Sequence, residues 1–467
     1  MQFLLHQGKY TCRVFILTIA FIFVTVYISL AQTSAFTPAT DNTELLTSFI
    51  SRSEQQYKKE LESLTGENKK DISDLYKLRW DNIKEKFDTK EIYSSAKAQE
   101  YLNEIVAEIV KANPTLQKQS FNCYFSRSGI PNATYIGEGI ILFNMGLFEK
   151  LDNESQAAFV LCHELSHFYL NHSENSIRKY VNTLNSKEVQ QALKRIKNSE
   201  FKKREELEKL VKGITFNSRK HSRDHEAEAD SMAIEFMRNT KFNLRESLTT
   251  LALLDTIDTD TLKTDLCLKR MFDSKEYPFK NKWIAKEEGL LGSHAQLNED
   301  ESLADSLKTH PDCKLRIKIL ESLVTKYQSA NTLKDLLDKT KFIELQNVFR
   351  YEIIEYAFTR NDYDKSLYYT LQLLQQHPSD PYLVTQVGRI MNGFYNAQKN
   401  HTLNKLASLP SPYYPSNYNL LLQFIQNLYK EDYASISYHF LNQYTPQLSD
   451  YAPFKKEYET SIQIAQQ

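Results

Sequence analysis

Apolar residues recur at helix-like spacing along most of the chain. Leu61, Leu64, Leu75 and Leu78, for example, follow this spacing among lysines and glutamates between residues 42 and 112. The same pattern predicts further helices at residues 153–170, 186–213, 216–237 and 315–327, and a succession of helices after about residue 330. Residues 263–305 lack a clear period and contain Pro278, Gly289 and Gly292, so we expect a loop-rich insertion there.

One short stretch has the character of strands. Between residues 120 and 143, Phe121, Cys123 and Phe125 alternate with polar residues, Gly137 and Gly139 bracket a turn, and a short apolar run follows. We predict a small sheet of three strands here. The expected fold class is therefore mainly α with a small β-sheet.

The chain changes character near residue 330, and we predict one domain over residues 32–330 and a second over 331–467. In the second, Asn361-Asp362-Tyr363 followed by Pro378 resembles half of a tetratricopeptide repeat. Stacked helical hairpins are one interpretation. The alternative is a helical tail that only packs against the first domain.

The N-terminus has the order of features found in a secretory signal peptide. Lys9 and Arg13 precede an uncharged run at residues 14–30, and Ser29 and Ala31 supply a cleavage site before Gln32. We predict a signal peptide at residues 1–31 and a mature chain in the periplasm or outside the cell. The alternative is an uncleaved anchor, which would keep the protein at the membrane.

Composition narrows the function classes. Lys and Arg total 58 against 59 Asp and Glu, so there is no overall basic field for binding nucleic acid. A mean hydropathy of -0.52 excludes a protein with many membrane spans. The four cysteines of the mature chain allow up to two disulfides, and the sequence does not select the pairing: Cys123, Cys162, Cys267 and Cys313.

The strongest chemical signal is His163-Glu164-Leu165-Ser166-His167, an H-E-x-x-H pattern on a predicted helix. Histidines four positions apart share a helix face, so two imidazoles can hold one Zn²⁺. Glu164 can then act as a general base toward an attacking water. The competing interpretation is a helix with two hydrogen-bonded histidines.

A second element supplies carboxylates. Glu226 and Asp230 are also four apart on a predicted helix. One carboxylate can complete the zinc site, and the other can accept the free ring N–H of a histidine ligand. Neighbouring His225 and Glu228 are expected to point elsewhere.

A third element, Thr309-His310-Pro311 with Arg316, completes a combination that resembles the gluzincin metallopeptidases of the CAAX prenyl protease and heat-shock membrane protease type. The matching residues are H-E-L-S-H at 163–167, E-A-E-A-D at 226–230 and T-H-P-x-x-x-x-R at 309–316, with Asn132-Ala133 before a strand and His172 five residues after His167. The polar stretch between His167 and Glu226 looks like the soluble, exported branch of that family.

The resemblance implies that His163, His167 and Glu226 bind zinc, and that Glu164 is catalytic. It further implies that Asp230 supports a histidine ligand, and that His310 and Arg316 act beside the site. A zincin fold follows, with an edge strand near Asn132 and Ala133 that holds the substrate.

We therefore predict an exported endopeptidase with one zinc per chain. Its partners would be protein or peptide substrates and, through the C-terminal helices, envelope proteins, with no nucleic acid and no membrane span after cleavage. The rival hypothesis is a chaperone-like assembly factor that binds proteins through its helical tail, with latent or secondary protease activity.

Overall fold

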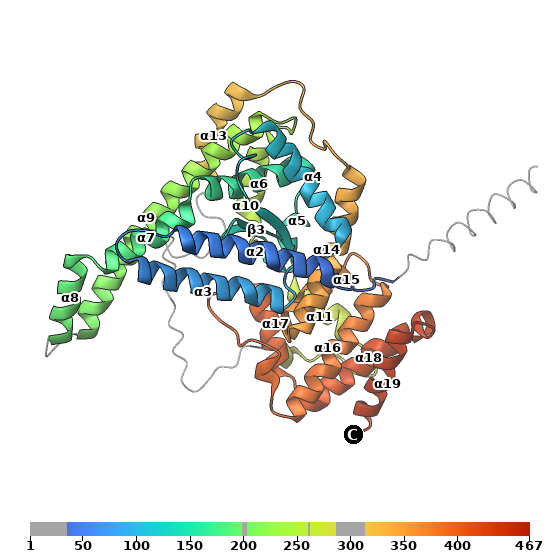
Figure 1. Cartoon of the computed structure of the whole chain (residues 1–467). Coiled ribbons are helices and arrows are strands. Elements are labelled where there is room, and N and C mark those ends of the chain that lie inside the picture. Colours follow the sequence, from blue (N-terminus) through green and yellow to red (C-terminus); the bar gives the residue numbers. More distant parts are fainter. Residues whose placement is uncertain (1–34, 199–202, 260–261, 286–312) are drawn as a thin grey trace, which may run out of the picture.

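The computed structural model describes residues 35–198, 203–259, 262–285 and 313–467. The predicted signal peptide and His310 lie outside these residues. Three helices come first, as the charged, periodic pattern predicted: α2 (Thr43–Ser63), α3 (Lys69–Asp88) and α4 (Ala96–Ala112). Figure 1 shows α2 and α3 lying side by side across one face of the molecule, near the sheet.

The predicted sheet is confirmed and has three strands in the order β1-β3-β2. Its strands are β1 (Asn122–Ser126), β2 (Ala133–Gly137) and β3 (Ile140–Asn144). β1 pairs with β3 in parallel, with Cys123 opposite Ile141. β2 pairs with β3 antiparallel, with Ala133 opposite Phe143, and it forms an edge of the sheet.

A cluster of buried and half-buried charges supports the turn between β2 and β3. Gly137, Glu138 and Gly139 all have positive φ, and a Cβ at Gly137 would lie 2.4 Å from Nε of Arg79. Arg79 donates to Glu138 at 2.9 Å and to Glu60 at 3.1 Å. Within the described part of the chain, Oε2 of Glu138 has no hydrogen-bond partner. Burial raises the pKa of Glu138 to about 8.

We expect Glu138→Gln to flatten the pH dependence of stability. A carboxyl whose folded-state pKa is raised from 4.5 to about 8 stabilises the fold at low pH. That contribution is lost as the pH rises through the folded pKa. Urea unfolding should show the wild type losing on the order of a few kcal/mol more than the variant between about pH 5 and 8. Exposed Glu62→Gln on α2 is the control, and identical profiles for Glu138→Gln and the wild type would contradict the prediction.

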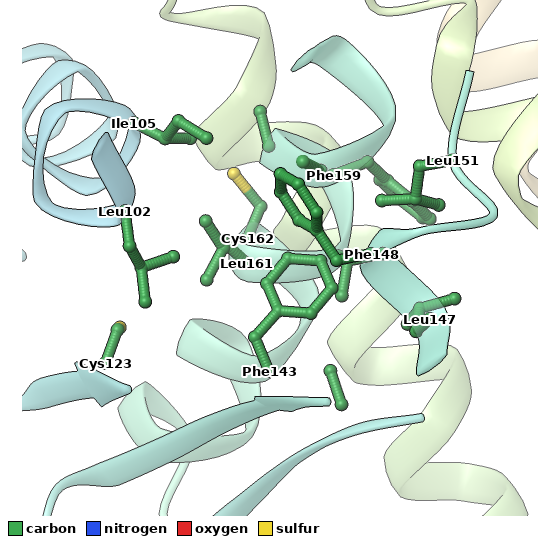
Figure 2. Packing of buried hydrophobic residues seen from close by; sticks show 14 of the residues in the cluster. Leu102, Ile105, Cys123, Phe143, Leu147, Phe148, Leu151, Phe159, Leu161 and Cys162 are labelled. Carbon is green, nitrogen blue, oxygen red and sulfur yellow. The ribbon is translucent and has the colours of Figure 1, made fainter. Parts of the chain in front are cut away.

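The main core lies between the sheet and the helices that follow it, α5 (Met145–Phe148) and α6 (Glu154–Tyr169). Figure 2 shows Phe143 of β3, Phe148 and Phe159 packed together, with Leu161 and Cys162 beside them. Asn153 caps the N-terminus of α6, because its side chain accepts a hydrogen bond from the backbone N–H of Gln156. The next helices are α7 (His172–Leu184), α8 (Lys187–Asn198), α9 (Lys203–Arg238) and α10 (Glu246–Thr256).

The predicted division between residues 213 and 216 is wrong, because α9 runs through it as one helix. A single glycine in a helix interior costs only about 1 kcal/mol relative to alanine, so Gly213 without a proline does not end the helix. Figure 1 shows α8 and the beginning of α9 projecting away from the body of the molecule.

The predicted loop at residues 263–305 is also corrected in part. It begins with α11 (Thr264–Phe272) and contains a short 3₁₀ helix, η1 (Asn281–Ile284). Leu268, Phe272 and Trp283 are buried in a second core formed by the C-terminal helices. Tertiary burial thus orders a stretch whose own periodicity is weak. Residues 286–305 of the insertion lie outside the described part.

Helix α13 (Cys313–Tyr327) is followed by α14 (Lys339–Thr359), α15 (Tyr363–Leu374), α16 (Pro381–Lys399), η2 (Leu403–Lys405), α17 (Ser416–Asn427), α18 (Lys430–Leu448) and α19 (Ala452–Ala465). The mainly helical fold class is confirmed. α14 joins both cores, since Phe342 and Phe349 pack in the first and Ile354 in the second. The domain boundary after residue 330 and the tetratricopeptide-like repeat stay predictions.

The described cysteines form no disulfide, although the sequence allowed up to two. All four are free and buried: Cys123, Cys162, Cys267 and Cys313. Among the described residues, no helix combines the length and the apolar character that crossing a membrane requires.

Candidate active site

Helix α6 presents the two histidines of the H-E-x-x-H pattern on one face. Nε2 of His163 and Nε2 of His167 lie 3.1 Å apart. The helix is held in place on its other sides, where Leu161, Cys162 and Leu165 are fully buried. The histidine side chains are only 11% and 16% exposed, so both rings are restrained by their surroundings.

Helix α9 brings Glu226 to the two imidazoles. Its two carboxylate oxygens lie 3.4 Å from Nε2 of His163 and 3.4 Å from Nε2 of His167. Burial would raise the pKa of Glu226, but hydrogen bonds with both histidines lower it well below the usual value, so the group is a carboxylate. Ligand atoms of all three residues lie within 4.8 Å of one another. Two imidazoles and one carboxylate are a donor set of catalytic zinc sites, so these residues fit that metal.

Asp230 lies behind His163, one helical turn after Glu226. Its Oδ1 is 2.9 Å from Nδ1 of His163. Arg316 of α13 donates to both oxygens of Asp230 at 2.7 Å, and its Nη1 is 3.5 Å from Glu226. Burial would raise the pKa of Asp230, but hydrogen bonds with Arg316 and His163 lower it. Asp230 is thus a fixed carboxylate 2.9 Å from Nδ1 of His163.

We expect Asp230→Asn to weaken zinc binding by roughly 10–100-fold, as the loss of a partner behind a metal ligand commonly does. The amide is neutral, so it removes the charge that is paired with the buried Arg316 at 2.7 Å and holds His163 less firmly. Competition with a chromophoric chelator measures the affinity, and exposed Asp81→Asn on α3 is the control. Unchanged affinity would show that Asp230 does not support the site.

Glu164 projects toward the sheet edge. Its Oε2 accepts a hydrogen bond of 2.6 Å from the backbone N–H of Tyr135 in β2. Burial raises the pKa of Glu164, as suits a general base. A cavity of about 400 Å³ opens between β2, the histidines and Glu226, and Asn132 and Ala133 line it.

Two predicted site residues, His310 and Arg316, remain to be placed. His310 lies outside the described residues, so its role stays a prediction. Arg316, predicted as catalytic, binds Asp230 and approaches Glu226. These contacts favour a positioning role, in which Arg316 orients carboxylates of the site.

The prediction that His225 and Glu228 point away from the site is wrong. Both side chains approach His172. Nδ1 of His172 is 2.9 Å from Nδ1 of His167, and its Nε2 is 3.1 Å from Oε2 of Glu228. The ring of His225 stacks on that of His172 with centroids 4.2 Å apart. Glu228 is two residues from Glu226 on α9, so the two side chains lie on different faces of the helix. Glu228 is linked to the site through His172 at the start of α7.

The profile of peptidase family M48 matches residues 96–324, which include every described residue of this site. No curated protein matches the chain. Family M48 comprises gluzincin metallopeptidases of the CAAX prenyl protease and heat-shock membrane protease types, and its members depend on zinc. The order of the motifs and the match agree, and through residues 96–324 the chain belongs to peptidase family M48.

Proposed function

We propose that this zinc metallopeptidase is an exported endopeptidase that cleaves protein substrates in envelope protein quality control, with one zinc per chain. The observation that carries the proposal is the meeting of His163, His167 and Glu226 next to Glu164 and an edge strand. When bound, zinc supplies Lewis-acid polarisation of a carbonyl and lowers the pKa of water. The family match does not favour the chaperone-like alternative.

In the proposed reaction Glu164 moves the proton. Its carboxylate accepts a proton from the attacking water and passes it to the leaving amine as the peptide C–N bond breaks. The hydrogen bond from the N–H of Tyr135 orients Glu164 beside the two histidines. His163 and His167 precede and follow Glu164 on the same helix, so one rigid element positions both the ligands and the base.

An extended peptide fits the edge of the sheet. Backbone groups of alternate residues in a strand point to the same side, so those of Ala133 face the same way as the N–H of Tyr135. Asn132, in contrast, accepts a hydrogen bond from Asn144 through its carbonyl and faces the sheet. We therefore propose that Ala133 binds the substrate backbone, and that Asn132 contributes to the cavity wall. Such strand addition tolerates many sequences, as protein quality control requires.

Export rests on the sequence of residues 1–31. We propose cleavage before Gln32 and a role in the periplasm or outside the cell, where the C-terminal helices would contact envelope proteins. Mass spectrometry of the exported protein tests this point. An intact Met1 would overturn cleavage.

Hydrolysis is tested with zinc-loaded full-length protein, unfolded casein and a quenched peptide. We expect cleavage that a chelator abolishes and added zinc restores. Mass spectrometry of the casein products should show cuts inside the chain. Products trimmed only from their ends would contradict an endopeptidase, and zinc-loaded protein that cleaves neither substrate would overturn the proposed activity.

A further inference from the structure

The two histidines of α6 have different partners at the ring nitrogens that face away from Glu226. Nδ1 of His163 lies against Asp230, which is 2% exposed and bound by Arg316. Nδ1 of His167 lies 2.9 Å from a third imidazole, that of His172. The first arrangement is buried and ends in an ion pair. The second leads outward to Glu228, whose side chain is 63% exposed.

The geometry assigns one proton to each of the two contacts His167–His172 and His172–Glu228. Nε2 of His167 faces His163 and Glu226, so it is the nitrogen available to a metal, and Nδ1 then carries the ring proton. Nδ1 of His167 therefore donates to Nδ1 of His172, which has to be unprotonated. The neutral ring of His172 carries its proton on Nε2 and donates it to Oε2 of Glu228.

The backbone and a neighbouring ring hold His172 in this place. Asn171 has a φ of 55°, a left-handed conformation that asparagine tolerates, and it joins the end of α6 to the start of α7. His172 is the first residue of α7 and is 5% exposed. The parallel ring of His225, at an interplanar angle of 7°, fixes the plane of the imidazole.

We propose that His172 and Glu228 form a positioning relay that holds His167 in the tautomer and orientation required to bind zinc. This proposal rests on the proposed zinc site. The experiment that tests it measures metal affinity and not hydrolysis. A protein that binds zinc but is inactive would therefore refute the proposed activity and leave the test of the relay intact. Neither residue touches the substrate in this role, so both are positioning residues.

The test measures zinc dissociation constants of the full-length protein by chelator competition. We expect His172→Ala to weaken binding by roughly 10–100-fold. His172→Asn should lose less, because its Oδ1 takes about the place of Nδ1 and accepts from His167. Glu228→Gln should cost about two- to five-fold, as expected for an exposed carboxylate. In the His172→Ala background Glu228→Gln should have no further effect, since Glu228 acts through His172.

Exposed Lys179→Ala on α7 and Glu235→Gln on α9 are matched controls, and melting of the zinc-free proteins separates folding from binding. The absorption spectrum of the cobalt-substituted protein should change in His172→Ala and remain native in both controls. Native zinc affinity in His172→Ala would overturn the proposal. The proposal would also be overturned if Glu228→Gln lowered zinc affinity equally with and without His172. The same holds if His172→Asn and His172→Ala lowered zinc affinity by the same factor.

Discussion

Glu164→Gln is expected to lower kcat for peptide hydrolysis by about 10²–10⁴-fold and to leave the zinc content unchanged. The amide is isosteric and can still accept from the N–H of Tyr135, so the local geometry should persist. It cannot take a proton from the attacking water. Glu164 also lies outside the group of side chains that fits a metal, so the variant should separate the base from the ligands.

Single-turnover hydrolysis of a quenched peptide, with zinc measured on the same preparation, checks this expectation. Glu149→Gln is the matched control. It removes a carboxylate that lies away from the cavity and accepts a hydrogen bond of 3.2 Å from Arg350. A Glu164→Gln protein that hydrolyses peptide at the native rate would show that another group acts as the base. A protein that loses its zinc would show that Glu164 is needed to hold the metal.

Short-range patterns predicted much of the fold, because they concern contacts within one element. The alternation near Cys123 and the turn at Gly137 depend on neighbouring residues. Elements that form only because residues far along the chain pack against them were not predicted. Leu268 in α11 is buried by helices far along the chain, and the place of α14 in both cores depends on tertiary packing.

The same distinction holds at the site. Spacing alone placed His163 and His167 on one helix face, and Glu226 and Asp230 on another. It left open which carboxylate faces the metal, and the structure brings Glu226 to both Nε2 atoms. The bond from Tyr135 to Glu164 joins a strand edge to a helix, and periodicity contains no information about such a contact.

The contacts around His172 show a further limit. Glu228 is two residues from Glu226, which puts the two on different helix faces. Its approach to the site depends on the position of His172 at the start of α7, where Nε2 of His172 lies 3.1 Å from Oε2 of Glu228. His172 was already among the residues that match the family, and a search for acidic residues flanking the third ligand would have added Glu228 as a candidate.

His167→Ala is expected to reduce bound zinc from about one per chain to well below that, and to abolish hydrolysis. The substitution removes one of three protein donors and also the partner of His172. Glu226→Gln should likewise lose metal, because the amide supplies no negative charge and leaves Arg316 near a neutral group. Exposed His377→Ala, which removes an imidazole from the C-terminal region, is the control.

Elemental analysis after dialysis against a weak chelator distinguishes loss of metal from loss of fold when it is paired with circular dichroism. Folded His167→Ala that retains about one zinc would mean that the metal lies elsewhere. The comparison with Glu164→Gln then decides the assignment of roles. Both proteins should be inactive, but only the one that lacks a ligand should be empty of zinc. Excess zinc should restore part of the activity of Glu226→Gln and none of that of Glu164→Gln, because mass action can refill a weakened site but cannot supply a missing base.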